Sequence, residues 1–154
     1  MRLYASGDQY LFCIYMLIKD ITNWGLKMTR LIGGSQEILN LWINHFNDNN
    51  ALGILDLYDQ KATLVPTFSS TFATNKKQIK DYFDKLFLKQ SINVTLEKDS
   101  IDELDASNCQ IIFGNYIFSH KLDENLVTFP CRYTFILDLE SSGPILHHHS
   151  SQLP

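Results

Sequence analysis

Hydrophobic residues follow a helical period in the first part of the chain and an extended one in the second. Between residues 38 and 46, one face of a helix is indicated by spacings of three and four residues: Ile38, Leu41, Trp42, His45 and Phe46. Ser35 is a candidate N-cap for this helix, and Glu37 lies in its first turn, where the helix dipole favours a carboxylate. The polar run at 47–50 predicts the end of the helix.

Two more helices and a short strand are predicted before residue 90. Residues 51–58 are typical of a short helix and residues 62–66 of a short strand. Asn75 can cap a third helix. One face of that helix carries Ile79, Tyr82, Phe83, Leu86 and Phe87.

From about residue 92 the pattern becomes that of β-strands. Four stretches are rich in β-branched and aromatic residues: 92–104, 109–120, 126–139 and 144–151. Polar turns separate them at hairpin-like spacing. Helices followed by consecutive hairpin-linked strands predict an α+β fold, with N-terminal helices packed on a curved antiparallel sheet.

Size and composition favour one domain at residues 34–154. The chain has 154 residues, of which 45% are apolar, enough for a single hydrophobic core. The formal net charge is −4, and the one basic cluster, residues 76–80, has the spacing of a solvated helix face. Binding to nucleic acid is therefore not expected. The three cysteines show no metal-binding or disulfide spacing, which favours reduced thiols in a cytoplasmic protein.

Residues 1–33 are expected to be an extension outside this domain. Their apolar run, residues 10–18, is too short to span a membrane. The segment is interpreted as an accessory helix or as a dispensable stretch upstream of a start at Met28. The alternative is an export signal with Arg2 as its positive end, which would place the protein in the periplasm or outside the cell. Asp8 and the lack of a small-residue cleavage site weigh against export.

The most distinctive motif is the run His147-His148-His149-Ser150-Ser151 near the C-terminus. Alternate side chains of a strand share a face. We therefore expect His147, His149 and Ser151 to point inward, toward the helices, and the other two to point outward. A buried polar group without a partner costs about 1–3 kcal/mol, so three in a row predict a pocket wall. A neutral histidine there can act as a base.

Other interpretations of this run stay open. It can lie at a solvated edge or at an interface between copies of the chain. An expression tag is disfavoured, because a strand-like lead-in precedes only three histidines. A zinc site would need a third ligand beside His147 and His149, from His45, His120 or a carboxylate. The sequence places none of these beside the pair, so no metal and no cofactor are expected, with zinc as the minor alternative.

Two further positions are candidates for chemistry. Arg132 lies in a strand-like stretch, where an inward guanidinium would offer a planar set of donors to a carboxylate and an outward one would be solvated. Thr67 follows Pro66, which ends the short strand, so its hydroxyl is expected at the strand's rim, near the phenol of Tyr82. Both residues can equally serve capping or packing.

Five motifs together resemble a known family. In chain order they are Trp42-x-x-x-Phe46, Leu64-Val-Pro-Thr67, Ile79-x-x-Tyr82-Phe83, Arg132-Tyr-Thr-Phe135 and His147-His-His-Ser-Ser-x-Leu-Pro154. They resemble the nuclear transport factor 2-like (SnoaL-like) superfamily, in the branch of the calcium/calmodulin-dependent kinase II association domain. The ending is most similar to iota-class carbonic anhydrases. Over residues 34–154, the resemblance implies a cone-shaped fold with a pocket between helices and sheet, in a homodimer or larger homo-oligomer.

The resemblance also implies an activity, the reversible hydration of carbon dioxide without a metal. It implies catalytic roles for Thr67, Tyr82, His149 and Ser151, with the substrate-binding residues His147 and Arg132 nearby. Water that is not bound to a metal has a pKa of about 15.7, against about 7 on zinc. Without a metal, a histidine base must therefore remove the proton from a much weaker acid. Residues 68–74 also lack the basic residue that relatives often carry in this loop. The alternative is a non-catalytic association or small-molecule-binding domain on the same fold.

Overall fold

The structure, a computed structural model, describes residues 34–154. The interpretations of residues 1–33 lie outside this range. Within it, no helix has the length and apolar character needed to cross a membrane.

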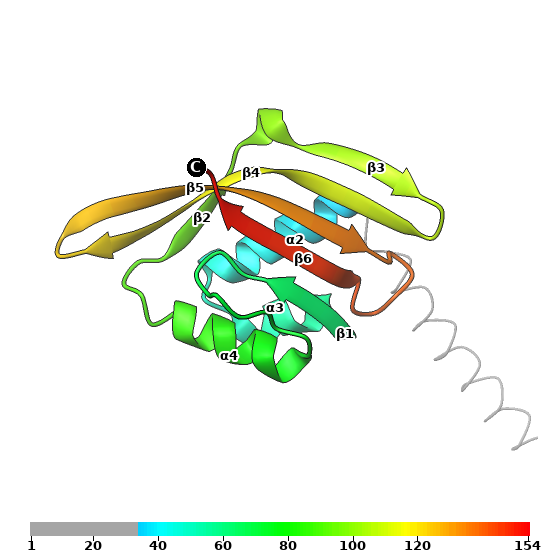
Figure 1. Cartoon of the computed structure of the whole chain (residues 1–154), viewed down its shortest axis with the longest axis horizontal. Helices are drawn as coiled ribbons and strands as arrows, with labels where there is room; N and C mark the ends of the chain where they lie inside the picture. The colour runs from blue at the N-terminus through cyan, green and yellow to red at the C-terminus, as the bar shows by residue number, and fades with distance from the viewer. Residues whose placement is uncertain (1–33) are drawn as a thin grey trace, which may run out of the picture. The chain divides into compact units, whose positions relative to one another are not determined.

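The α-helices of residues 34–154 are α2 (Ser35–Asn47), α3 (Ala51–Leu57) and α4 (Lys76–Leu86) (Figure 1). The prediction that Ser35 caps α2 was wrong. The carbonyl of Gly34 accepts the hydrogen bond of the Glu37 amide at 2.9 Å, so the helix begins one residue earlier and Ser35 is buried in its first turn. His45, predicted on the apolar face, lies at its half-exposed edge, where its Nδ1 is 3.3 Å from the side-chain nitrogen (Nδ2) of Asn50.

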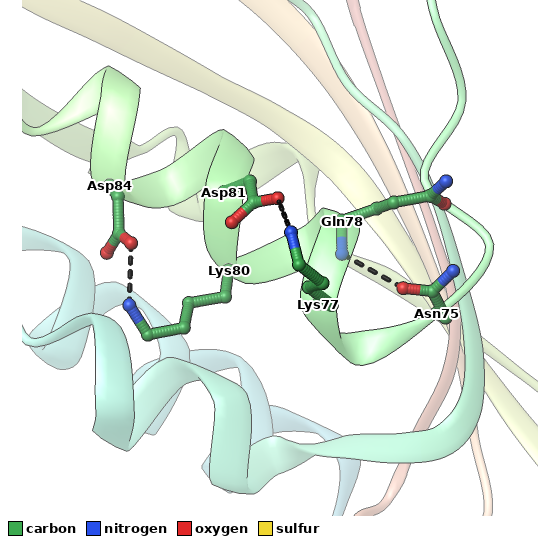
Figure 2. Close-up of polar contacts among 6 residues, drawn as sticks. All are labelled: Asn75, Lys77, Gln78, Lys80, Asp81 and Asp84. Atoms are coloured by element: carbon green, nitrogen blue, oxygen red, sulfur yellow. Dashed lines mark hydrogen bonds and ion pairs between the residues drawn. The ribbon is translucent and has the colours of Figure 1, made fainter.

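Helix α4 follows its sequence pattern closely. The Asn75 side chain accepts a hydrogen bond from the Gln78 amide at 3.0 Å, which confirms the predicted cap. Figure 2 shows this cap beside two ion pairs of the i,i+4 type on the solvent side, Lys77–Asp81 at 2.7 Å and Lys80–Asp84 at 2.6 Å. Such exposed pairs add little stability. The helix is held instead by its opposite face, where Ile79, Phe83 and Leu86 are buried.

The strands of the described residues form one open, mixed sheet. They are β1 (Tyr58–Val65), β2 (Asn93–Leu96), β3 (Asp102–Ala106), β4 (Cys109–Leu122), β5 (Asn125–Leu137) and β6 (Ile145–Gln152). Their order is β1-β6-β5-β4-β2, and β3 also pairs with β4. The fold is therefore α+β, as predicted. The expectation of a purely antiparallel sheet was wrong at one place, because β1 pairs in parallel with β6.

The predicted strand at 92–104 is two strands separated by a short 3₁₀ helix, Lys98–Ser100. Strand β2 pairs with residues 116–119 of β4, and β3 pairs with residues 109–113. The 3₁₀ turn packs over Gly114, where an added Cβ would lie 2.9 Å from the Ser100 carbonyl oxygen. The missing side chain leaves room for the break, which an alternation pattern does not reveal.

The core lies between the helices and one face of the sheet. Trp42 of α2 is at its centre, with ring centroids 5.3 Å from Phe46 and 5.6 Å from Phe135. The buried large side chains include Tyr58, Tyr116 and Tyr133 as well as apolar residues. This interior thus contains several hydroxyl groups, and buried polar groups of this kind usually have a hydrogen-bond partner.

Candidate functional site

The inner face of β6 carries His148 and Ser150, with 2% and 4% of their surfaces exposed. The expectation that His147, His149 and Ser151 face inward was therefore wrong. Leu137 of β5 pairs with Ile145, but Ile136 pairs with His147, so β6 has one extra residue at this point. Such a bulge reverses the alternation that follows it. Counted from the buried Ile145, simple alternation gives the wrong set.

Ser150 lies at the centre of a cluster of three hydroxyls. Its Oγ contacts the hydroxyls of Thr67, from the loop after β1, and of Tyr116, from β4. Tyr116 is completely buried, and burial raises the pKa of its phenol well above the ordinary value. We call Thr67, Tyr116 and Ser150 the hydroxyl cluster. It joins three elements that are far apart in the sequence.

A second polar chain ends at His148. The indole nitrogen of Trp42 donates to the Tyr58 hydroxyl at 3.2 Å, and that hydroxyl lies 2.8 Å from Nδ1 of His148. The imidazole also stacks on Phe135, with centroids 4.0 Å apart and planes at 16°. Burial, with smaller contributions from His147 and His149, holds the pKa of His148 well below its usual range. His148 is therefore a neutral ring fixed on an aromatic wall.

Tyr82 lies on α4 and is half-buried. It lines an open groove of about 540 Å³ between α4 and the loop after β1, together with Pro66 and Phe68, which flank Thr67. Burial raises the pKa of Tyr82, and a hydrogen bond with the Phe68 backbone partly offsets this. Thr67, which lies between two residues that line this groove, is therefore in the same region as Tyr82, as expected.

The other predicted site residues lie on the outer face of the sheet. His147 is half-buried, and its Nδ1 is 2.6 Å from the Thr63 hydroxyl. Partial burial lowers the pKa of His147, and the charge of the neighbouring His149 lowers it further. His149 pairs with Val65 and Thr134 in the strand register.

Arg132 is exposed and lies opposite Ser151, so its guanidinium is on the solvated side of β5. None of these outer residues joins the hydroxyl cluster. Within residues 34–154, no three histidine, cysteine or acidic side chains are grouped in a way that could hold a metal ion.

The comparisons with known proteins identify the fold. No family model and no curated protein matches the sequence. A solved structure from Xanthomonas campestris, named for a calcium/calmodulin-dependent protein kinase II association domain, has a TM-score of 0.67 and 24% identity, covering 79% of this chain and 89% of that one. The CaMKII hub of S. rosetta has a TM-score of 0.66 and 14% identity, covering 79% and 98%. A protein from Streptomyces avermitilis, named as a dehydratase of the NTF2-like family, has a TM-score of 0.65 and 9% identity, covering 76% and 91%.

This chain has the NTF2-like fold. The predicted cone fold is thereby confirmed. Because the sequence identities to these structures are low, the similarity shows the fold alone. Among these structures are one protein named as a dehydratase and one hub.

The sequence-based predictions do not include the interior position of four polar residues of this NTF2-like fold: Tyr58, Tyr116, His148 and Ser150. Tyr116 lies two residues before Phe118 on β4 and so shares its buried face, and this apolar alternation is the signal in the sequence for its burial. The local pattern places Tyr58 at the end of a helix, whereas it begins β1, and its role depends on the long-range contact with His148.

Proposed function

We propose that this chain is a small-molecule pocket protein that binds carbon dioxide and bicarbonate at the hydroxyl cluster and catalyses their interconversion. The observation that carries the proposal is the Ser150 hydroxyl, held between the hydroxyls of Thr67 and Tyr116. The two neighbours of Thr67, Pro66 and Phe68, line the same groove as Tyr82. The resemblance of the chain's ending to iota-class carbonic anhydrases supplies the reaction. The roles first assigned to His149 and Ser151 pass to His148 and Ser150, because only these lie on the inner face.

Hydroxyl groups suit this reaction because each can donate and accept a hydrogen bond. As water attacks the carbon of carbon dioxide, Ser150 accepts a proton from that water and passes its own proton to a carbon dioxide oxygen. The product is carbonic acid, which ionises to bicarbonate and a proton after release. Thr67 and Tyr82 donate to the oxygens on which charge develops. This route avoids transferring the proton to a histidine whose pKa is already depressed.

The test is a stopped-flow measurement of carbon dioxide hydration by the full chain, using a pH indicator. We expect Ser150→Ala and Thr67→Val to lose most activity, while Ser151→Ala, the matched control on the outer face, retains it. A folded wild-type protein without hydration activity refutes the proposal. Loss in Ser151→Ala with retention in Ser150→Ala would instead favour the outer residues. Activity removed by a chelator and restored by zinc would overturn the metal-free mechanism.

A second candidate function is self-association into a homodimer or larger ring. It is favoured by the outer face of the sheet, where Ile111, Ile117 and Ile136 are only half-buried and Phe113 is 38% exposed. None of the described helices covers this face (Figure 1). The solution mass from light scattering should then exceed that of a monomer, and Ile136→Glu should lower it. A monomeric wild-type chain at micromolar concentration contradicts this candidate.

A further inference from the structure

The Trp42–Tyr58–His148 chain of hydrogen bonds has a fixed direction. An indole nitrogen can only donate, so the Tyr58 oxygen accepts the bond from Trp42. The hydrogen of the Tyr58 hydroxyl then has one available acceptor among the described residues, which is Nδ1 of His148 at 2.8 Å. If Nδ1 carried the proton instead, this hydroxyl hydrogen would be buried without an acceptor. That arrangement is disfavoured, because an unpaired buried donor is costly.

The proton of the neutral imidazole must therefore be on Nε2. This atom is buried and has no hydrogen-bond partner within residues 34–154. An N–H group in this position can donate but cannot accept. His148 is also completely enclosed, between Phe135 on one face and the edge contact with Trp42, at centroid distances of 4.0 and 5.1 Å. Its ring is thus held in one orientation by packing as well as by hydrogen bonding.

The hydroxyl cluster lies next to His148 on the same strand face. Ser150 is two residues further along β6, which corresponds to a separation of about 7 Å. Both side chains face the helices, and no acidic residue is among the buried polar side chains of the described residues. The buried wall formed by these groups therefore offers hydrogen-bond donors and contains no carboxylate, whereas Asp81 lines the groove that also includes Tyr82. This favours a ligand that presents oxygen acceptors.

We propose that Trp42 and Tyr58 fix His148 as the Nε2–H tautomer, and that His148 recognises the bound molecule by donating to one of its oxygen atoms. The ligand class is a small carboxylate-like acceptor, such as bicarbonate or formate, and His148 is a hydrogen-bond donor and not the base of the reaction. Tyr58 and Trp42 are positioning residues, since they act through His148. This proposal rests on the ligand site of the proposed function, but not on its catalytic step.

The first experiment measures the tautomer in the full chain by long-range ¹H–¹⁵N correlation of its histidines. We expect the His148 signals of an Nε2–H tautomer in the wild type. Tyr58→Phe should give mixed tautomers at His148. Tyr133→Phe is the matched control, because it also removes a buried phenolic hydroxyl, but one that has no hydrogen-bond partner among residues 34–154. A wild-type His148 protonated on Nδ1 overturns the proposal, and so does a Tyr133→Phe effect equal to that of Tyr58→Phe.

The second experiment titrates bicarbonate and formate and follows the His148 Nε2 resonance. We expect a shift that saturates with both anions and does not occur with guanidinium, which can only donate. Gln at position 148 can place a donor near the position of Nε2, whereas Asn cannot reach it. His148→Gln should therefore retain affinity for formate, and His148→Asn should lose about tenfold or more. Absence of any shift with either anion overturns the donor role. A protein that shows the shift but hydrates no carbon dioxide contradicts the proposed reaction and leaves this inference standing.

Discussion

Replacing Ser150 with alanine should destabilise the protein much more than the same change at Ser151. Ser150 is 4% exposed, and its hydroxyl is the hydrogen-bond partner of the buried Tyr116 phenol. The substitution leaves that phenol without a partner in the interior, and an orphaned buried donor costs about 1–3 kcal/mol. Ser151 lies on the half-exposed outer face, where such substitutions usually change stability by about 0.5 kcal/mol or less.

Urea unfolding followed by circular dichroism measures both free energies of unfolding, and equal slopes would show that the variants unfold in the same way. A double-mutant cycle with Tyr116→Phe isolates the cause. When the phenol is already absent, Ser150→Ala leaves no orphan at Tyr116 and should cost less. The reasoning fails if the two serine variants cost the same, or if Ser151→Ala costs more. Either result would mean that the inner face of β6 is not the one occupied by Ser150.

Three other predictions concern packing, pH and capping. Gly143→Ala would place a Cβ 2.6 Å from the Tyr58 carbonyl oxygen, and this overpacking should lower the free energy of unfolding by about 1–3 kcal/mol, which a lower melting temperature would show. Gly34→Ala, where the added Cβ would meet no atom of residues 34–154 within 4 Å, is the control. Folding depresses the pKa of His148, so as the pH falls below about 6.5 this histidine is protonated in the unfolded chain but not in the folded one. The free energy of unfolding should therefore decrease as the pH is lowered below about 6.5. His148→Gln should make this pH dependence of urea unfolding shallower, and an unchanged profile would refute the assignment. Asn75→Ala should cost about 0.5–2 kcal/mol through loss of the α4 cap, whereas Asn75→Ser should cost little.

Much of the secondary structure follows from local patterns. Helix α4, from Lys76 to Leu86, was predicted from its cap and its apolar spacing, because both are properties of neighbouring residues. Strands β4, β5 and β6 begin and end within two residues of the predicted stretches. Thr67 was identified at the end of the first strand, and the structure places its hydroxyl against Ser150.

The tertiary structure alone decided which histidine and which serine face the interior. Alternation along β6 tells which side chains share a face, but the extra residue opposite Ile136 and Leu137 exchanges the two faces. Whether a bulge forms depends on the partner strand, which the sequence of β6 does not contain. The parallel pairing of β1 with β6, and the contact of Tyr58 with His148, likewise join residues at opposite ends of the described chain. The sequence by itself predicted a run of histidine and serine on the last strand; long-range strand pairing determined that His148 and Ser150 are its inner members.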